Sequence, residues 1–134
     1  MDWKIELIPV PVTDVDRARD FYEAQLGWHV DVDDAPEPGI RVVQLTPPGS
    51  ACSIVIGTGV AEGAPGSVRG IRVVVADVAA ARDELVGRGV ACGPVRHWED
   101  GGWAEGKGGR WNSFVTFHDP DGNGWELQEA PAAD

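Results

Sequence analysis

A short segment occurs twice in this chain, once near its start and once past its middle. Residues 10–20 read VPVTDVDRARD and residues 73–83 read VVVADVAAARD, with seven identities in the eleven positions. A second pair of segments also matches, TPPGSACSI at 46–54 and DPDGNGWEL at 119–127. Repetition at a fixed spacing indicates that one structural unit has been duplicated, and a duplicated unit restricts the folds that the chain can adopt.

The repeat divides the chain into two modules of similar length. Module one covers about 4–57 and module two about 69–130, and the Gly-rich stretch at about 58–68 is the natural linker between them. A chain of 134 residues suits one compact domain, so we expect 1–134 to form a single domain built from both modules.

Each module has the pattern of a strand, a helix and three further strands. Apolar residues alternate at Ile8, Val10 and Val12, and an Asp that can cap a helix follows in both modules, Asp14 and Asp77. Two tandem β-α-β-β-β modules predict an α+β fold with the helices outside the sheets and a shared groove between the inner faces. The further strands are expected at 28–33, 40–46, 51–57, 90–97, 112–118 and 124–129.

Charge and composition exclude several classes of protein. The net charge of −11 argues against a nucleic-acid partner, because the phosphate backbone would be repelled. No apolar run approaches the roughly 20 residues that cross a bilayer, and no segment resembles a cleaved signal peptide. Two cysteines, Cys52 and Cys92, fit free thiols better than a disulfide framework. We therefore expect a cytoplasmic protein without a membrane partner.

The two ends of the repeat resemble a known superfamily. The segment IPVPVTDVDRARDFYEAQLGW is similar to the opening strand and helix of glyoxalase/bleomycin-resistance/dioxygenase (vicinal oxygen chelate, VOC) proteins, and FHDPDGNGWELQE to their closing hairpin. The resemblance implies a curved, cup-like mixed sheet and a homodimer. It leaves the activity open, because one fold can carry many functions.

Many members of this superfamily hold a divalent metal in four slots, on the first and last strand of each module. The resemblance and the repeat together place these slots at Leu7, Ser53, Gly70 and Glu126. One carboxylate without an imidazole does not make a site for Zn²⁺, Ni²⁺ or Fe²⁺, and the three histidines lie outside the slots. We therefore expect no metal and no cofactor.

Side-chain alternation from the slots predicts which residues line the groove. Successive side chains of a strand point to opposite faces, so residues two apart from a slot face the groove as well. Trp125 and Leu127 are then expected to face the helix layer. The predicted ligand-binding residues on the strands are Leu7, Pro9, Ser53, Val55, Arg72 and Gln128.

Glu126 is the strongest candidate for catalysis. A carboxylate on an inward, mostly apolar face could act as a general acid or base. The alternative is a salt bridge with Arg72 that only supports the structure. His97 is a weaker candidate, because a histidine at a strand end can transfer protons near neutral pH but is more often simply solvated.

Two tryptophans flank the Gly-rich stretch EDGGWAEGKGGR at 99–110, and a third lies within it. Trp98, Trp103 and Trp111 could form a lid that stacks on a flat ligand, with Asn112 offering a hydrogen bond. Alternatively, the tryptophans anchor the loop or bury a dimer contact, and Asn112 is an ordinary polar turn residue.

Two functions remain in competition, and both involve a small organic molecule. The first is a metal-independent binding protein that encloses a hydrophobic or aromatic ligand, as in antibiotic sequestration, where the acidic surface would attract a cationic compound. The second is a metal-independent isomerase, lyase or natural-product tailoring enzyme that uses Glu126 as general acid/base. Loss of three metal slots favours the first.

Overall fold

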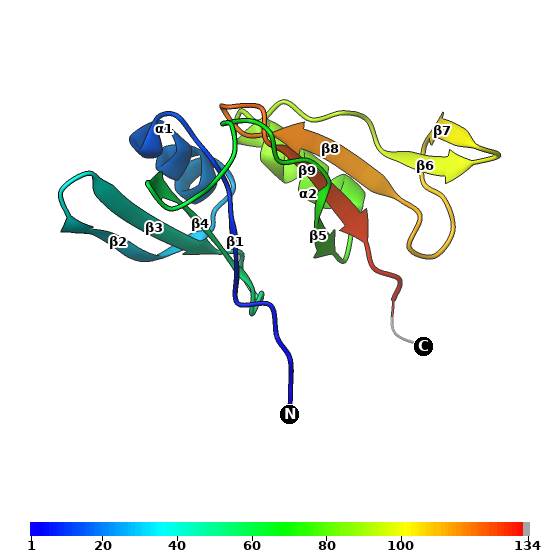
Figure 1. Ribbon diagram of the computed structural model, residues 1–134. Helices are drawn as coiled ribbons and strands as arrows, with labels where there is room; N and C mark the ends of the chain where they lie inside the picture. The colour runs from blue at the N-terminus through cyan, green and yellow to red at the C-terminus, as the bar shows by residue number, and fades with distance from the viewer. Residues whose placement is uncertain (133–134) are drawn as a thin grey trace. The chain divides into compact units, whose positions relative to one another are not determined.

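Two separate β-sheets, one in each half of the chain, make up the computed structural model, which describes residues 1–132 (Figure 1). The described residues divide into two units. The first comprises Met1–Val68 with Asp119–Asn123, and the second Arg69–His118 with the residues from Gly124 onward. Two mixed sheets with few helices give the α+β class that the repeat predicts.

The first unit contains a four-stranded sheet with the order β1-β4-β3-β2. β1 lies parallel to β4, and the remaining neighbours are antiparallel. Helix α1 continues directly into a short π-helix, η1. The elements are β1 (Leu7–Pro9), α1 (Val15–Asp20), η1 (Phe21–Gln25), β2 (His29–Glu37), β3 (Ile40–Thr46) and β4 (Ser53–Thr58).

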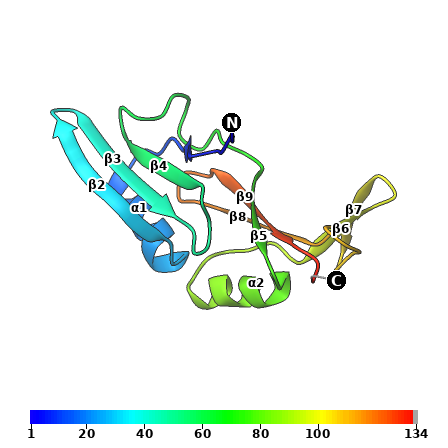
Figure 2. The ribbon, with the colours of Figure 1, turned by 90° about the horizontal axis from the view of Figure 1, so that it is seen from below.

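The second unit contains a five-stranded sheet with the order β5-β9-β8-β6-β7. Its first strand again lies parallel to its last, so the duplicated topology is visible in both units. Figure 2 shows α2 lying along one side of this sheet. The elements are β5 (Ile71–Val75), α2 (Val78–Gly87), β6 (Arg96–Glu99), β7 (Gly102–Glu105), β8 (Phe114–His118) and β9 (Gly124–Glu129).

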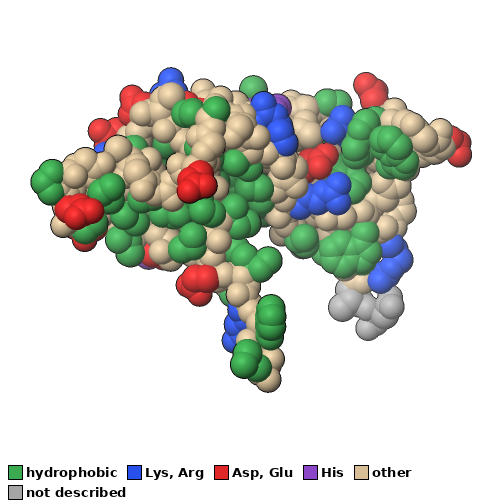
Figure 3. Space-filling model, in the orientation of Figure 1, with side chains coloured by type: hydrophobic (Ala, Val, Ile, Leu, Met, Phe, Trp, Pro, Cys, Tyr) green, Lys and Arg blue, Asp and Glu red, His purple; other side chains and the backbone are tan. Residues whose placement is uncertain are grey.

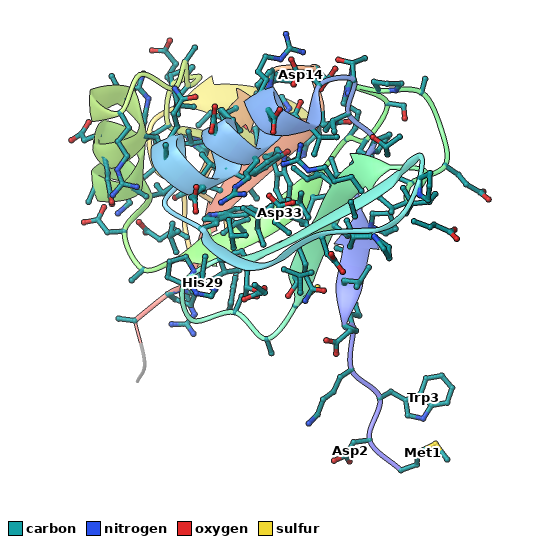
Figure 4. All side chains as sticks on the ribbon, turned by 90° about the vertical axis from the view of Figure 1, so that its left-hand side faces the viewer. Met1, Asp2, Trp3, Asp14, His29 and Asp33 are labelled. Carbon is teal, nitrogen blue, oxygen red and sulfur yellow. The ribbon has the colours of Figure 1, made fainter. Side chains whose placement is uncertain are left out.

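Both helices begin at the aspartates that the sequence indicates. The carboxylate of Asp14 accepts a hydrogen bond from the backbone N–H of Arg17, and that of Asp77 accepts one from Ala80. Figure 4 shows Asp14 at the start of α1. Each carboxylate satisfies an N–H group that has no partner inside the helix, which confirms the predicted caps.

The helices cover the apolar faces of the sheets. In the first unit Tyr22 and Ala18 are fully buried beside Trp28. In the second unit Trp125 and Leu127 are buried on the side of β9 that faces α2, as predicted from side-chain alternation. Among residues 1–132, no helix has the length and apolar character that crossing a membrane requires.

The prediction of a strand at 90–97 is wrong. Cys92 makes only an isolated bridge to Phe117, and the strand begins at Arg96. Pro94 explains the break, because proline has no backbone N–H and cannot continue a hydrogen-bonded ladder. The strand instead extends past Trp98 into a hairpin.

That hairpin occupies half of the stretch that the sequence suggests to be a Gly-rich loop. β6 and β7 pair with each other, and Trp98 lies directly opposite Trp103. The turn uses Asp100 and Gly101, both with positive φ (49° and 81°), as a two-residue type I′ turn requires. The alternation of apolar and polar residues in β6 and β7 is too short, and their Gly content too high, for the sequence alone to reveal these two strands.

The turn of module two, DPDGN, makes its contacts inside the first unit. Asn123 is fully buried, and its amide donates to the carbonyl of Pro11 at 2.9 Å and to the carboxylate of Asp119 at 2.8 Å. The hydroxyl of Tyr22 donates to the same carboxylate at 2.8 Å. The predicted turn is therefore present, and it also ties distant segments of the chain together.

Candidate functional site

One face of the second sheet brings charged and aromatic side chains together. Strand pairing places Arg72 beside Glu126 and Arg96 beside Phe114. Trp103 reaches the same face from β7, because it lies opposite Trp98. We call this set the arginine–aromatic face: Arg72, Arg96, Trp98, Trp103, Phe114 and Glu126.

Glu126 lies at the centre of this face and is paired with two arginines. Its Oε2 is 3.5 Å from Nε of Arg72, and its Oε1 is 3.3 Å from Nη2 of Arg96. The residue is 9% exposed, so both ion pairs are partly shielded from water. The salt bridge with Arg72, which the sequence offers as the structural alternative to catalysis, is therefore present, and Arg96 adds a second one.

The same arginines also pack against aromatic rings. The guanidinium carbon of Arg96 lies 3.8 Å from the ring centroid of Trp103, and that of Arg72 lies 5.0 Å from Phe114. Trp103 in turn meets Trp98 and Phe114 edge to face, at 5.2 and 5.5 Å. Cation–π and edge-to-face contacts each add stabilisation of about 1 kcal/mol, so the cluster holds its side chains in defined positions.

A pocket of about 360 Å³ opens next to Glu126 and Arg96. Its volume falls within the range of small-molecule sites. Figure 3 shows apolar, basic and acidic side chains close together over this part of the second unit. The other lining residues are Arg69, Gly70, Thr116, His118, Gly124 and Trp125.

His97 is engaged elsewhere. Because side chains alternate along β6, His97 points away from the arginine–aromatic face. Its Nδ1 donates to the carbonyl of Gly106 at 2.8 Å, and its Nε2 lies 2.7 Å from the carboxylate of Glu99. The Glu99 hydrogen bond, followed by the Gly106 carbonyl, raises the pKa of His97 above its ordinary value. The residue therefore stabilises the hairpin, and we leave it out of the site.

The segment after the hairpin is held by side-chain hydrogen bonds to the backbone. The amide of Asn112 accepts from the N–H of Trp98 and donates to its carbonyl, both at 2.9 Å. Asn112 thus pairs with the backbone of Trp98 as a neighbouring strand would. Gln128 similarly donates to the carbonyl of Trp111 at 2.9 Å.

Trp98, Trp103 and Trp111 are each about half exposed, so they could all meet a ligand. Trp111 has a positive φ of 62°, which costs a non-glycine residue ~1–2 kcal/mol. The Gln128 hydrogen bond helps to hold this conformation. Trp98 and Trp103 are fixed by the hairpin, so these two do not belong to a loose lid.

The candidates from module one share a face of the first sheet. Leu7 pairs with Ser53, and Pro9 pairs with Val55. Ser53 is buried, and its hydroxyl lies 2.6 Å from that of Thr46. The amide of Gln44 reaches the same hydroxyl at 3.4 Å, so Gln44 and Thr46 of β3, which the sequence analysis did not single out, belong to this face.

Three of the four predicted slots, Leu7, Ser53 and Glu126, lie on strands, whereas Gly70 directly precedes β5. Leu7 and Ser53 are register partners on neighbouring strands, whereas Arg72, two residues after Gly70, pairs with Glu126. Within residues 1–132 there is no group of three or more His, Cys, Asp or Glu side chains that could hold a metal ion.

The site residues that sequence reasoning missed are Arg69, Arg96, Phe114, Thr116 and His118. Phe114 lies opposite Gln128, and Arg96 lies opposite Phe114, so both could be found by alternation once the register of β6, β8 and β9 is known. The misplaced strand at 90–97 concealed that register. His118 follows the same alternation as Phe114 on β8.

The chain belongs to the superfamily that this fold and site suggest. It matches the Glyoxalase/Bleomycin resistance protein/Dioxygenase superfamily over residues 4–127. Comparison with the curated proteins gave no match.

Several solved structures are similar over nearly the whole chain. One is TnmS3, described as an antibiotic binding protein from Streptomyces sp. CB03234, with 32% identity, a TM-score of 0.78, and coverage of 96% of this chain and 97% of that one. Another is a glyoxalase/bleomycin resistance protein from the same source, with 33% identity, a TM-score of 0.74, and coverage of 93% and 99%. A superfamily member from Sphaerobacter thermophilus DSM 20745 shares 27% identity, with a TM-score of 0.76 and coverage of 96% and 98%.

Proposed function

We propose that this protein binds a small hydrophobic or aromatic organic molecule, without a metal ion, and sequesters it unchanged. The observation that carries the proposal is the pocket lined by Glu126 and Arg96, together with the half-exposed Trp103, on whose ring the guanidinium of Arg96 stacks at 3.8 Å. Flat aromatic surface beside a few fixed polar groups is the usual composition of a small-molecule site. The similarity to an antibiotic binding protein supports the same function.

Glu126 acts in this proposal as an anchor for the two arginines. A general acid or base must exchange a proton with the substrate, and it needs an oxygen within reach of the reacting atom. Both oxygens of Glu126 already face guanidinium groups at 3.3 and 3.5 Å. This arrangement favours binding over the isomerase or lyase alternative.

The test is a tryptophan-fluorescence titration with a panel of aromatic compounds, in the presence of EDTA, followed by mass spectrometry of the recovered ligand. We expect quenching with a compound that is recovered unchanged. Trp103→Leu should weaken binding about tenfold, since it removes an aromatic contact surface. The matched control is Trp3→Phe, because Trp3 is 90% exposed and lies on the segment that extends away from β1 (Figure 4).

Three outcomes would contradict parts of the proposal. Consumption of the ligand by the wild type, and binding without turnover by Glu126→Gln, would establish the enzymatic alternative. Binding that requires added Ni²⁺, Zn²⁺ or Fe²⁺ would contradict metal independence. Equal affinity in Trp103→Leu and wild type would place the ligand elsewhere.

The homodimer and the cytoplasmic location that we expect from the sequence remain part of the proposal. Sedimentation equilibrium across a range of protein concentrations measures the first. A single species with the mass of one chain would contradict it.

A further inference from the structure

The charge around the pocket is opposite in sign to that of the whole chain. The protein carries a net charge of −11, yet Arg72 and Arg96 both pair with the single carboxylate of Glu126, and Arg69 lines the same pocket as Arg96. The other carboxylate on this face, Glu105, is exposed on the outer strand β7. Locally, positive charge is therefore in excess.

The guanidinium group of Arg96 is fixed in position by its neighbours. Trp103 covers one side of its guanidinium at 3.8 Å, and Glu126 contacts Nη2. Its Nε is buried and has no hydrogen-bond partner among residues 1–132. A guanidinium that is already fixed loses little conformational entropy when it binds an anion, and its planar fork suits carboxylates and similar groups.

Arg69 faces the same pocket from the start of the second unit. It passes over Gly124, where an added Cβ would lie 3.1 Å from the Arg69 Cδ and 3.7 Å from the His118 ring. Arg69, Arg96 and His118 therefore lie around one pocket of about 360 Å³. Attraction between this group and an anion is strengthened by partial exclusion of water.

We infer that the ligand is a planar aromatic compound with an acidic group that is ionised at neutral pH, and that Arg96 and Arg69 bind this group. The aromatic part stacks beside the exposed tryptophans of the hairpin. This inference rests on the proposed function and makes it specific, and it replaces the cationic ligand that the net charge alone suggests. The long-range field of the acidic surface slows the approach of such a ligand, while the local arginines determine its affinity.

The experiment uses three compounds of one shape: 2-naphthoate, 2-naphthamide and 2-naphthylmethylammonium. Calorimetry on the full chain should show 2-naphthoate binding at least tenfold more tightly than the neutral amide, with the cation weakest. Arg96→Gln should weaken 2-naphthoate about tenfold and leave 2-naphthamide within twofold, because only the charge-assisted hydrogen bonds are lost. Arg69→Gln should act in the same direction.

Arg88→Gln is the matched control, because Arg88 pairs with Glu84 on α2 and does not line the pocket. It should change no affinity. Near-UV circular dichroism shows whether a variant has kept its fold. If Arg96→Gln has lost its fold, the affinities of Arg69→Gln test the inference instead.

Several results would overturn the inference without contradicting the proposed function. If all three compounds bind alike, or if the cation binds most tightly, the arginines do not select the ligand, and the proposed binding function stands. If Arg96→Gln weakens amide and carboxylate equally, Arg96 only supports the pocket. Absence of binding for all three compounds at millimolar concentration would overturn the inference. The fluorescence titration with the panel of aromatic compounds would then test the proposed function by itself.

Discussion

The hydroxyl of Tyr22 donates a 2.8 Å hydrogen bond to the carboxylate of Asp119, 97 residues further along the chain. Tyr22 lies on η1 and is fully buried, and Asp119 begins the turn between β8 and β9. The bond therefore joins the first helical segment to the turn that precedes the last strand.

Removal of this hydroxyl is expected to destabilise the protein. Tyr22→Phe keeps the buried ring and leaves one oxygen of a buried carboxylate with Asn123 as its remaining side-chain partner. We expect a loss of about 1–2 kcal/mol in the free energy of unfolding. Urea denaturation followed by fluorescence measures it. An unchanged midpoint would mean that water replaces the hydroxyl without cost.

Asn123 is expected to tolerate substitution less well than Tyr22. Its amide donates to Pro11 and Asp119, and its carbonyl oxygen accepts from the N–H of Val68. Asn123→Asp replaces the donating NH₂ by an oxygen that faces a carbonyl and a carboxylate. The loss should be about 3 kcal/mol or more, since a buried charge is introduced whose new oxygen faces two acceptors and no donor.

Asn123→Ser is the control for that substitution, because it introduces no charge. It should destabilise the protein less than Asn123→Asp when both are measured by thermal unfolding at pH 7. The reverse order would show that loss of the amide, and not the new charge, controls stability here.

The hairpin β6–β7 is expected to become less stable as the pH rises through the raised pKa of His97. The pKa of His97 is raised in the folded protein, first by Glu99 and then by the carbonyl of Gly106, from an ordinary value of about 6.5. A raised folded pKa means that the stabilisation is complete below the unfolded pKa and is lost as the pH rises through the folded pKa.

An NMR titration of the His97 ring tests this pH dependence. Glu99→Gln should lower the pKa of His97 and flatten the pH dependence of unfolding. Glu105→Gln is the matched control, because Glu105 lies on β7 opposite Arg96 and does not contact His97. Equal shifts in both variants would rule out a specific bond to Glu99.

Asn112 is expected to position the tryptophans of the hairpin. Asn112→Ala removes both hydrogen bonds to the backbone of Trp98, which should cost about 2 kcal/mol and change the near-UV circular dichroism. Asn112→Asp keeps the acceptor for the Trp98 N–H and loses the donor, so its effect should be smaller. Identical spectra for wild type and Asn112→Ala would contradict this role.

Local sequence signals predicted the fold where a residue acts on its nearest neighbours. Asp14 and Asp77 cap helices through bonds to N–H groups three residues away, so the sequence contains the whole interaction. The turn at Asp119 was predicted for the same reason. Pro94 also gave a local signal against the expected strand at 90–97, which the alternation of apolar residues concealed.

Contacts between distant strands could not be predicted in the same way. Glu126 and Arg72 were placed on one face because their strands alternate regularly. The pairing of Arg96 with Glu126 depends on the register of β6 against β8. That register is set by contacts between strands that are distant in the sequence. The stacking of Arg96 on Trp103 further requires a hairpin that the Gly-rich sequence does not reveal.

The sequence by itself determined the duplication, the helix starts and the shared face of Glu126 and Arg72, because repeats, caps and side-chain alternation are properties of neighbouring residues. Only the tertiary structure decided the second partner of Glu126 (Arg96), the position of the tryptophans and the positive charge around the pocket. These features arise where strands that are distant in the chain lie side by side, and net composition does not report the charge at one face. The local excess of positive charge around Arg96 and Arg69 is therefore a property of the fold.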